Sequence, residues 1–229
     1  MSLFTIGDLH LSEGTDKPMN VFGDKWTDHA DKLKASFSAL SSEDTCVLCG
    51  DLSWGKTLEE CREDFLLIDS FPGRKVILKG NHDYWWSTAS KAKSFFRENG
   101  IETIDIIHNN CIFYGDIAIC GTRGWFFEEE TGSVHDRKIM LREIGRLQTS
   151  LEAAGEKEKI VFLHYPPVFG NYRCDEIIEL LKSHNVRLCC YGHIHGKACN
   201  AALNGWYSGI EFKLVSADYL NFSPIKVID

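Results

Sequence analysis

The sequence predicts a layered α/β domain. Short apolar segments of strand length alternate with amphipathic segments of helical length over most of the chain, and a hairpin-like tail follows them. The 229 residues are 44% hydrophobic and 25% charged, which is the composition of an ordinary globular protein with one sizeable core. We therefore expect a single domain over residues 1–229, although two small domains are possible.

The N-terminal part of the chain pairs each strand with a helix. The predicted strands are residues 3–6, 46–49 and 76–78, and the predicted helices are residues 28–40, 58–71 and 87–99. In the first helix, Leu33, Phe37 and Leu40 recur at helical spacing. Pro72-Gly73 follows the second helix, where such residues commonly end one.

The rest of the chain begins with a predicted hairpin. Apolar residues 111–114 and 117–120 flank Gly115-Asp116, a typical turn sequence. The other predicted elements are helices at 134–154 and 174–183, strands at 160–163 and 186–191, and strands with turns over 205–227. This order of elements favours sheets covered by helices.

Charge and hydropathy exclude several classes of protein. The formal net charge of −8 argues against a general binder of nucleic acids or anionic membranes, which usually has a basic face. Residues 1–6 run directly into Gly7-Asp8 without the regions of a signal peptide. No apolar run approaches the ~20 residues of a membrane span. We therefore expect a cytoplasmic protein without a nucleic-acid or membrane partner.

The nine cysteines lie mostly within apolar segments. An odd number without a secretion signal indicates reduced, buried thiols rather than a disulfide framework. Cys46 and Cys49 have the spacing of a zinc-ligand pair. Their segment is predicted as a strand, however, on which residues three apart point to opposite faces. We expect these two thiols to pack in the core.

Polar residues typical of metal or catalytic sites follow several predicted strands. Gly80-Asn81-His82-Asp83 comes directly after residues 76–78, although alone it is also consistent with a solvated turn. The full set is Asp8, His10, Asp51, Asn81, His82, Asp83, His164, His193 and His195. Open α/β sheets form their ligand crevice at the carboxyl ends of strands, so we expect these residues to converge. The other histidines, expected at the surface, are His29, His108, His135 and His184.

The chemistry of this set favours two metal ions. Imidazole nitrogens with carboxylate and amide oxygens, without thiolates, suit Mn, Fe or Zn. Without His82 and Asp83, this set contains seven candidate ligands. Seven ligands exceed the needs of one tetrahedral ion with an open position, and they suit two ions that share a bridging carboxylate. Two ions about 3.5–4 Å apart can hold a phosphoryl group, activate water near neutral pH and stabilise both oxygens of an in-line displacement.

In their order along the chain, these residues form a pattern that resembles the calcineurin-like metallophosphoesterases. The pattern of that family is Asp-x-His, Gly-Asp, Gly-Asn-His-Asp/Glu, a lone His and Gly-His-x-His. The matching segments are Asp8-Leu9-His10, Gly50-Asp51, Gly80-Asn81-His82-Asp83, His164 and Gly192-His193-Ile194-His195. The resemblance implies a four-layer α/β/β/α sandwich with a site for two divalent or mixed-valence metal ions at the strand ends.

The resemblance also implies a role for each residue. One metal ion would be bound by Asp8, His10 and His195, the other by Asn81, His164 and His193, with Asp51 bridging the two. His82 would face the phosphate as a general acid or an electrostatic stabiliser, and Asp83 would orient it. Water activated by the metals would be the nucleophile, so no covalent enzyme intermediate is implied.

The sequence departs from one branch of this family. Its protein serine/threonine phosphatases have an Asp-Arg-Gly segment after Gly-Asp, whose Arg binds the phosphate, whereas residues 52–55 here are LSWG. This difference weakens the interpretation as a protein phosphatase. Arg123 is the candidate substitute for binding substrate phosphate, because a guanidinium makes bidentate phosphate contacts. The alternative is a surface arginine in a Gly-rich turn.

Aromatic residues flank two of the motifs. Trp54, Tyr84, Trp85 and Trp86 either pack around the loops and hold them rigid, or form a wall for a base or an aromatic leaving group. Residues 125–130, which are aromatic and acidic, are consistent with a lid, a dimer contact or a solvated loop.

The sequence thus favours a dinuclear-metal hydrolase that cleaves a phosphate ester with metal-activated water. The preferred substrate is a small or protein phosphomonoester, and the alternative is a cyclic nucleotide or another small diester. A nuclease is disfavoured because the acidic chain has no Lys/Arg-rich tract. A non-catalytic scaffold is also disfavoured, because some relatives become scaffolds after losing ligands, whereas every ligand position and His82 are filled here.

Overall fold

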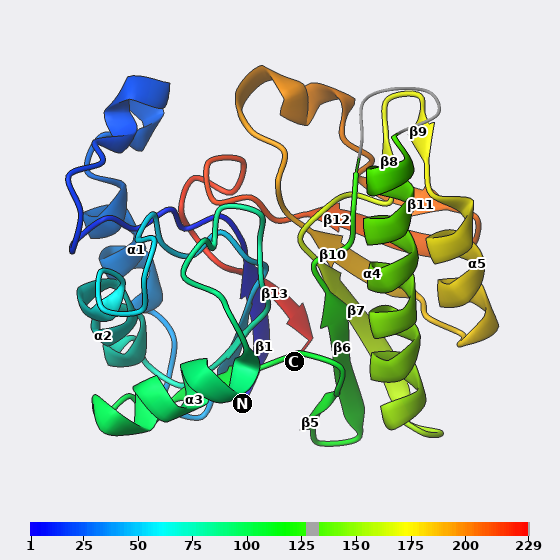
Figure 1. The fold of residues 1–229 in the computed structure, drawn as a ribbon, viewed down its shortest axis with the longest axis horizontal. Coiled ribbons are helices and arrows are strands. Elements are labelled where there is room, and N and C mark those ends of the chain that lie inside the picture. Colours follow the sequence, from blue (N-terminus) through cyan, green and yellow to red (C-terminus); the bar gives the residue numbers. More distant parts are fainter. Residues whose placement is uncertain (127–132, 229) are drawn as a thin grey trace.

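The computed structural model describes residues 1–126 and 133–228. Two β-sheets lie face to face, and helices cover the outer face of each sheet (Figure 1). This arrangement of helix, sheet, sheet and helix confirms the four-layer sandwich that the resemblance implied.

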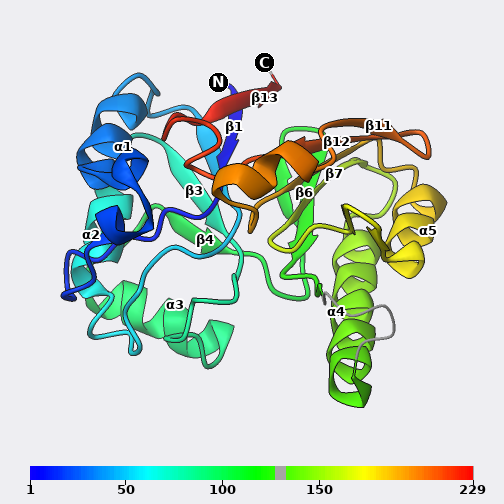
Figure 2. The same cartoon turned by 90° about the horizontal axis from the view of Figure 1, so that it is seen from above.

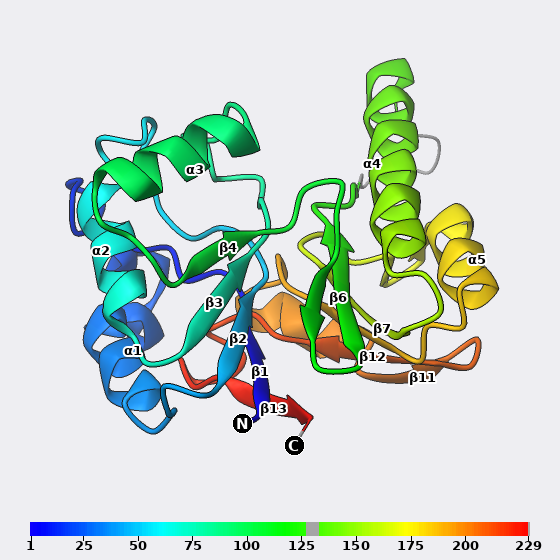
Figure 3. The ribbon, with the colours of Figure 1, turned by 90° about the horizontal axis from the view of Figure 1, so that it is seen from below.

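The first sheet has the strand order β13-β1-β2-β3-β4. Its parallel strands are β1 (Leu3–Ile6), β2 (Thr45–Leu48), β3 (Arg74–Ile77) and β4 (Ile104–Ile106). β13 (Ile225–Ile228) pairs antiparallel with β1, so that a late segment of the chain lies beside the first strand (Figure 3). All four parallel strands therefore end at one edge of the sheet.

The second sheet has the order β11-β12-β10-β7-β6-β5. Its parallel strands are β6 (Ile117–Thr122), β7 (Glu158–Leu163), β10 (Leu188–Tyr191) and β12 (Ile210–Leu214). The antiparallel edge strands are β5 (Ile112–Tyr114) and β11 (Gly205–Tyr207). The predicted hairpin is confirmed as β5–β6. A separate short hairpin consists of β8 (Val168–Phe169) and β9 (Tyr172–Arg173).

The helices form two groups on opposite sides of the sheets (Figure 2). The first sheet is covered by α1 (His29–Phe37), α2 (Arg62–Ser70) and α3 (Ala89–Glu98), and the second by α4 (Val134–Ala153) and α5 (Asp175–Ser183). Three 3₁₀ helices are η1 (Met19–Phe22), η2 (Asp24–Trp26) and η3 (Gly196–Ala201). Among the described residues, no helix has the length and apolarity needed to cross a membrane.

Each interface between layers has its own apolar core. Phe37 and Phe65 pack between the first sheet and its helices, and Leu147 packs between the second sheet and α4 and α5. Val76 and Phe162 belong to the core between the two sheets. Both sheets are thus buried on both faces, which explains why their parallel strands read as continuous apolar runs.

The cysteines follow the predicted pattern. All nine are free thiols. Cys46 packs in the core on the helix side of the first sheet, and Cys49 packs in the core between the sheets. The two sulfurs lie on opposite faces, so the pair does not form a zinc site.

Three kinds of local prediction need correction. The helix expected from residue 58 begins at Arg62, because residues 58–61 form turns. β4, β8 and β9 were not predicted, since strands of two or three residues give no periodic signal. His29 is buried rather than exposed, and its Nε2 lies 3.1 Å from the carbonyl oxygen of His10.

Candidate metal centre

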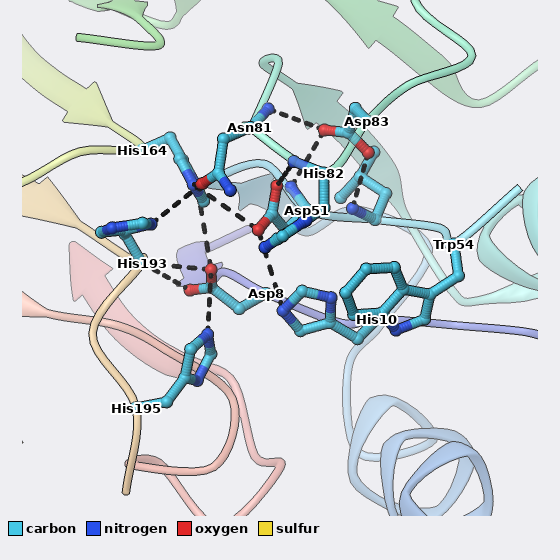
Figure 4. A network of polar contacts seen from close by, with 12 residues as sticks. Asp8, His10, Asp51, Trp54, Asn81, His82, Asp83, His164, His193 and His195 are labelled. Atoms are coloured by element: carbon cyan, nitrogen blue, oxygen red, sulfur yellow. Dashed lines mark hydrogen bonds and ion pairs between the residues drawn. The ribbon is translucent and has the colours of Figure 1, made fainter. Parts of the chain in front are cut away.

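The strand-end segments of both sheets meet in one place. The loops after β1, β2 and β3 face the loops after β7 and β10, and their side chains point toward a common centre (Figure 4). The parallel strands of each sheet end on this side, which is where open α/β sheets place their ligands.

The backbone in these loops is strained. Asp8, His10, Asp51 and His193 have φ angles of 58°, 47°, 51° and 73°. Non-glycine residues rarely occupy this left-handed region, and such strain concentrates at functional sites. Hydrogen bonds between the loops hold this backbone conformation in place. The N–H group of Asp8 donates to the carbonyl group of Gly50, and that of His10 donates to the carbonyl group of Asp51, both at 2.9 Å.

Two glycines allow the loops to approach each other closely. A Cβ atom at Gly80 would lie 2.1 Å from Oδ1 of Asp51, and one at Gly192 would lie 2.3 Å from Oδ2 of Asp8. Real Cβ atoms do not make such contacts, so a side chain at either position would displace a carboxylate. This packing explains why each motif begins with glycine.

The buried carboxylate of Asp83 joins two of the loops. It accepts hydrogen bonds from the N–H groups of Gly80 at 2.7 Å, of Asp51 at 2.9 Å and of Leu52 at 2.9 Å. The indole N–H of Trp85 donates to it at 3.0 Å. These four bonds fix the loop after β2 against the loop after β3.

The expectation that Asp83 orients the imidazole of His82 stays a prediction, and no direct hydrogen bond between the two side chains is described. The hydrogen-bond partners described for Asp83 are the four N–H groups above, while His82 Nδ1 lies 3.0 Å from the hydroxyl oxygen of Tyr84. The backbone N–H of His82 donates to Oδ1 of Asp51 at 2.7 Å. An orienting effect of Asp83 on His82 would thus act through the shape of the loop.

The first predicted ligand group is brought together. Asp8, His10 and His195 each place a donor atom near the others, within 4.8 Å. Nε2 of His195 lies 3.6 Å from Oδ1 of Asp8. The buried Nδ1 of His10 has no hydrogen-bond partner among the described residues, which is an unusual state for a buried polar atom.

The second predicted group also converges. The side-chain oxygen of Asn81 lies 2.6 Å from Nε2 of His164 and 2.9 Å from Nδ1 of His193. Asp51 lies between the two groups, with its Oδ2 at 3.6 Å from Nε2 of His164 and 3.8 Å from Nε2 of His10. All seven predicted ligands therefore surround one centre.

Burial shapes the electrostatics of these groups. Burial, opposed by His164, raises the pKa of Asp51 to about 7. Burial and the charge of His164 lower the pKa of His193 to about 3, and burial also lowers the pKa of His10. Burial would raise the pKa of Asp8, but the neighbouring His195 outweighs it and lowers this pKa. The lowered pKa values of His10 and His193 favour neutral imidazoles, which is the form in which histidine binds metal.

The residues fit two first-row metal ions. Separations of 3.6–3.8 Å between carboxylate and imidazole atoms are too long for hydrogen bonds, and they suit ligands arranged around a shared cation. The ring nitrogen of His10 that faces the shared carboxylate of Asp51 is Nε2, at 3.8 Å. The donor set consists of imidazole, carboxylate and amide groups, and the identity of the metals as Mn, Fe or Zn stays a prediction.

Sequence reasoning missed Asp218. Its buried carboxylate lies 2.9 Å from Nδ1 of His195 and accepts a hydrogen bond from the N–H of Gly196 at 2.8 Å. Burial would lower the pKa of His195, but the carboxylates of Asp218 and Asp8 raise it to about 10. A carboxylate behind a metal-binding histidine fixes its ring and increases its basicity. Asp218 follows β12, so a sharper prediction of that strand could have identified it.

The four aromatic residues near the motifs divide into two pairs. Trp85 is buried against Phe65, and Trp86 packs against Trp85, so this pair supports the loop. Trp54 and Tyr84 instead line an open cavity beside His82. Trp54 also stacks on His10, with ring centroids 4.8 Å apart.

Arg123 lies away from this cavity. Its Nη2 is 3.3 Å from Oε1 of the buried Glu143, and its guanidinium lies over the ring of Trp125. A role in binding substrate phosphate stays a prediction, and it would require the guanidinium to leave Glu143. Of the aromatic and acidic stretch 125–130, residues 127–130 lie outside the described residues.

A two-sheet α/β sandwich whose strand ends gather carboxylate, amide and imidazole groups has the architecture of a metal-dependent hydrolase. The calcineurin-like phosphoesterase family matches residues 1–197, and the chain belongs to this family. It is therefore a metal-dependent phosphoester hydrolase of a family whose sites hold two metal ions.

Solved structures share the fold at low identity. The phosphopantetheinyl hydrolase PptH from Mycobacterium tuberculosis is 13% identical, with a TM-score of 0.62 and coverage of 99% of this chain and 95% of that one. The protein of unknown function AQ665 from Aquifex aeolicus is 17% identical, with a TM-score of 0.51 and coverage of 98% and 95%. No curated protein matches the chain significantly. These structures support the fold and leave the substrate open.

The role of Asp83 is testable by removing its charge. Asp83→Asn should lower the free energy of unfolding of the metal-free protein by about 3 kcal/mol, because an amide cannot accept all four N–H bonds and its own N–H₂ faces donors. Urea unfolding in a chelator measures this change. Asp105→Asn, at a half-exposed ion pair with Arg74, is the control and should cost less than about 1 kcal/mol. Equal effects of the two variants would contradict the proposed role.

The role of Asp218 predicts a selective loss of metal affinity. Asp218→Asn should weaken binding of one metal ion by roughly 10- to 100-fold, because His195 loses its charged partner. Calorimetric titration with Mn²⁺ measures both affinities. Asp175→Asn, at an exposed position in α5, should bind as the parent protein does. Unchanged affinities in Asp218→Asn would refute this assignment.

Proposed function

We propose that the chain is a phosphatase that hydrolyses the phosphomonoester of a small molecule. The observation that carries this proposal is a cavity of about 660 Å³ beside His10, His82 and His195. This volume lies in the range of about 300–1,000 Å³ that is typical of small-molecule sites. A monoester has one organic group, and this cavity is large enough to receive it next to the metal-binding residues.

Seven side chains would hold the two metal ions. Asp8, His10 and His195 would bind one, Asn81, His164 and His193 the other, and Asp51 would bridge them. When bound, the two ions would polarise the phosphoryl oxygens and lower the pKa of water at the site. The loops fix these side chains in place before the substrate binds, through the bonds to Asp83 and the contacts at the glycines.

His82 is the proposed proton donor. Its imidazole lines the cavity together with His10 and His195, and its Nδ1 contacts the hydroxyl of Tyr84 at 3.0 Å. Burial and the charge of His164 lower the pKa of His82, which makes the protonated ring a readier acid. A phosphoryl group beside the ring would favour its protonated form.

The reaction is a direct displacement by water. The water oxygen loses one proton to solvent and forms a bond to phosphorus while the P–O ester bond breaks, and the electron pair of that bond moves to the leaving oxygen. His82 transfers its proton to this oxygen, so that an alcohol and inorganic phosphate result. His82 then regains a proton from solvent.

Several finer points stay predictions from the sequence. They are the identity of the metals as Mn, Fe or Zn, the single-domain organisation over residues 1–229, the cytoplasmic location and the lack of nucleic-acid partners. A protein phosphomonoester, a small diester and a scaffold role are the alternatives to the proposed function.

A paired assay tests the preference for monoesters. The Mn-loaded protein should cleave p-nitrophenyl phosphate faster than bis-p-nitrophenyl phosphate. Asp51→Asn should lose metal and activity together, because Asp51 contacts both ligand groups. Faster cleavage of the diester would favour the phosphodiesterase alternative. Inactivity toward both, in a protein that contains no metal, would favour the scaffold.

The proposed role of His82 predicts a dependence on the leaving group. His82→Ala should retain both metals and lower kcat by roughly 10²–10⁴-fold for alkyl phosphates, with a smaller loss for p-nitrophenyl phosphate, whose leaving oxygen needs no proton. His108→Ala, at a half-buried histidine outside the metal centre, is the control. Metal analysis accompanies the kinetics. Loss of metal in His82→Ala, or equal losses for both substrates, would show that the role is wrong.

A further inference from the structure

The cavity beside the metal centre has an aromatic wall. Phe22, Trp26, Trp54 and Tyr84 line it. The rings of Phe22 and Trp54 are nearly parallel, with an interplanar angle of 8° and centroids 6.3 Å apart. Phe22 and Tyr84 are both 57% exposed, which is unusual for large apolar rings. A ligand with a planar ring could cover this surface by stacking.

Two cations lie in the same wall. Lys17 and Lys25 line the cavity, and among the described residues neither ammonium group has a carboxylate within 4.0 Å. The ammonium of Lys17 lies 4.1 Å from the ring centroid of Trp54 and 5.5 Å from that of Phe22. The chain as a whole has a net charge of −8, so this pair of lysines is a local exception.

Asp218, the acidic residue that lines the cavity, already has hydrogen-bond partners. The carboxylate of Asp218 is held by Nδ1 of His195 and by the N–H of Gly196. The positive charge of the two lysines therefore attracts anions to the cavity, in addition to the attraction by metal ions bound at the centre. An inorganic phosphate or a simple sugar phosphate would use neither the aromatic wall nor this second attraction.

Building on the proposed function, we infer that the substrate is a nucleotide with a second phosphoryl group. The phosphoryl group to be cleaved lies at the metal centre, the base stacks on the exposed ring of Phe22, and the second phosphoryl group contacts Lys17 and Lys25. This inference specifies the organic group that the cavity receives, and it commits to a planar base in preference to an alkyl chain.

Three commercial probes separate the parts of this inference. Ribose 5-phosphate has neither a base nor a second phosphoryl group, 5′-AMP adds the base, and adenosine 3′,5′-bisphosphate adds both. With the Mn-loaded protein, kcat/KM should rise about tenfold or more when the base is added, as expected for one stacked base. It should rise again with the second phosphoryl group, and this second rise should decrease with added salt.

Substitutions in the wall should remove these preferences separately. Phe22→Ala should reduce the ratio of kcat/KM for 5′-AMP to that for ribose 5-phosphate. Lys25→Ala should reduce the ratio of the bisphosphate to 5′-AMP. The matched controls are Val21→Ala, at the exposed neighbour of Phe22, and Lys56→Ala, at an exposed lysine that does not line the cavity, and both should keep the parent ratios.

A binding readout distinguishes failure of this inference from failure of the proposed function. Because Trp26 and Trp54 line the cavity, adenosine 3′,5′-bisphosphate should quench tryptophan fluorescence in a saturable way, and Phe22→Ala should weaken this effect. Equal hydrolysis of all three probes, without saturable quenching, would overturn the inference and leave the phosphatase function standing. Saturable quenching without any hydrolysis would support the nucleotide site and overturn the phosphatase function. Neither quenching nor hydrolysis would overturn both.

Discussion

The four hydrogen bonds that converge on the buried Asp83 carboxylate are the constraint on which the metal centre depends. They fix the N–H groups of Gly80, Asp51 and Leu52, and so set the distance between the loop after β2 and the loop after β3. That distance is short enough to exclude a side chain at Gly80. The strained backbone of Asp51 persists because these bonds oppose its relaxation. The centre is therefore preorganised by the protein, and metal ions would balance the charge of its buried carboxylates.

The two sides of the site come from different parts of the fold. The candidate metal ligands follow parallel strands of both sheets, whose ends are buried. The cavity wall comes largely from the segment with η1 and η2, where Lys17, Phe22 and Trp26 lie outside the sheets. This separation lets the hydrolytic chemistry stay constant while the organic group that is accepted depends on a loop.

The sequence predicted which residues come together at the site better than it predicted the contacts that their side chains make. The strand-end residues were predictable because parallel strands carry whatever follows them to one edge of a sheet. The position of Asp83 directly after His82 suggested a contact between the two side chains. The hydrogen bonds described for the Asp83 carboxylate instead come from backbone N–H groups and from Trp85. The buried His29 was missed because tertiary packing alone brings it to the site. Asp218 was missed because the end of β12, the strand that it follows, was not predicted closely enough. Packing likewise decides that Trp54 lines the cavity whereas Trp85 lies in the core.

A crystal structure of the Mn-soaked protein, with anomalous data collected at the Mn absorption edge, tests the central claim most directly. The account predicts two anomalous peaks about 3.5–4 Å apart. One peak should lie beside Asp8, His10 and His195, the other beside Asn81, His164 and His193, and the Asp51 carboxylate should contact both. A single peak, or peaks away from these side chains, would contradict the dinuclear centre on which the proposed function rests.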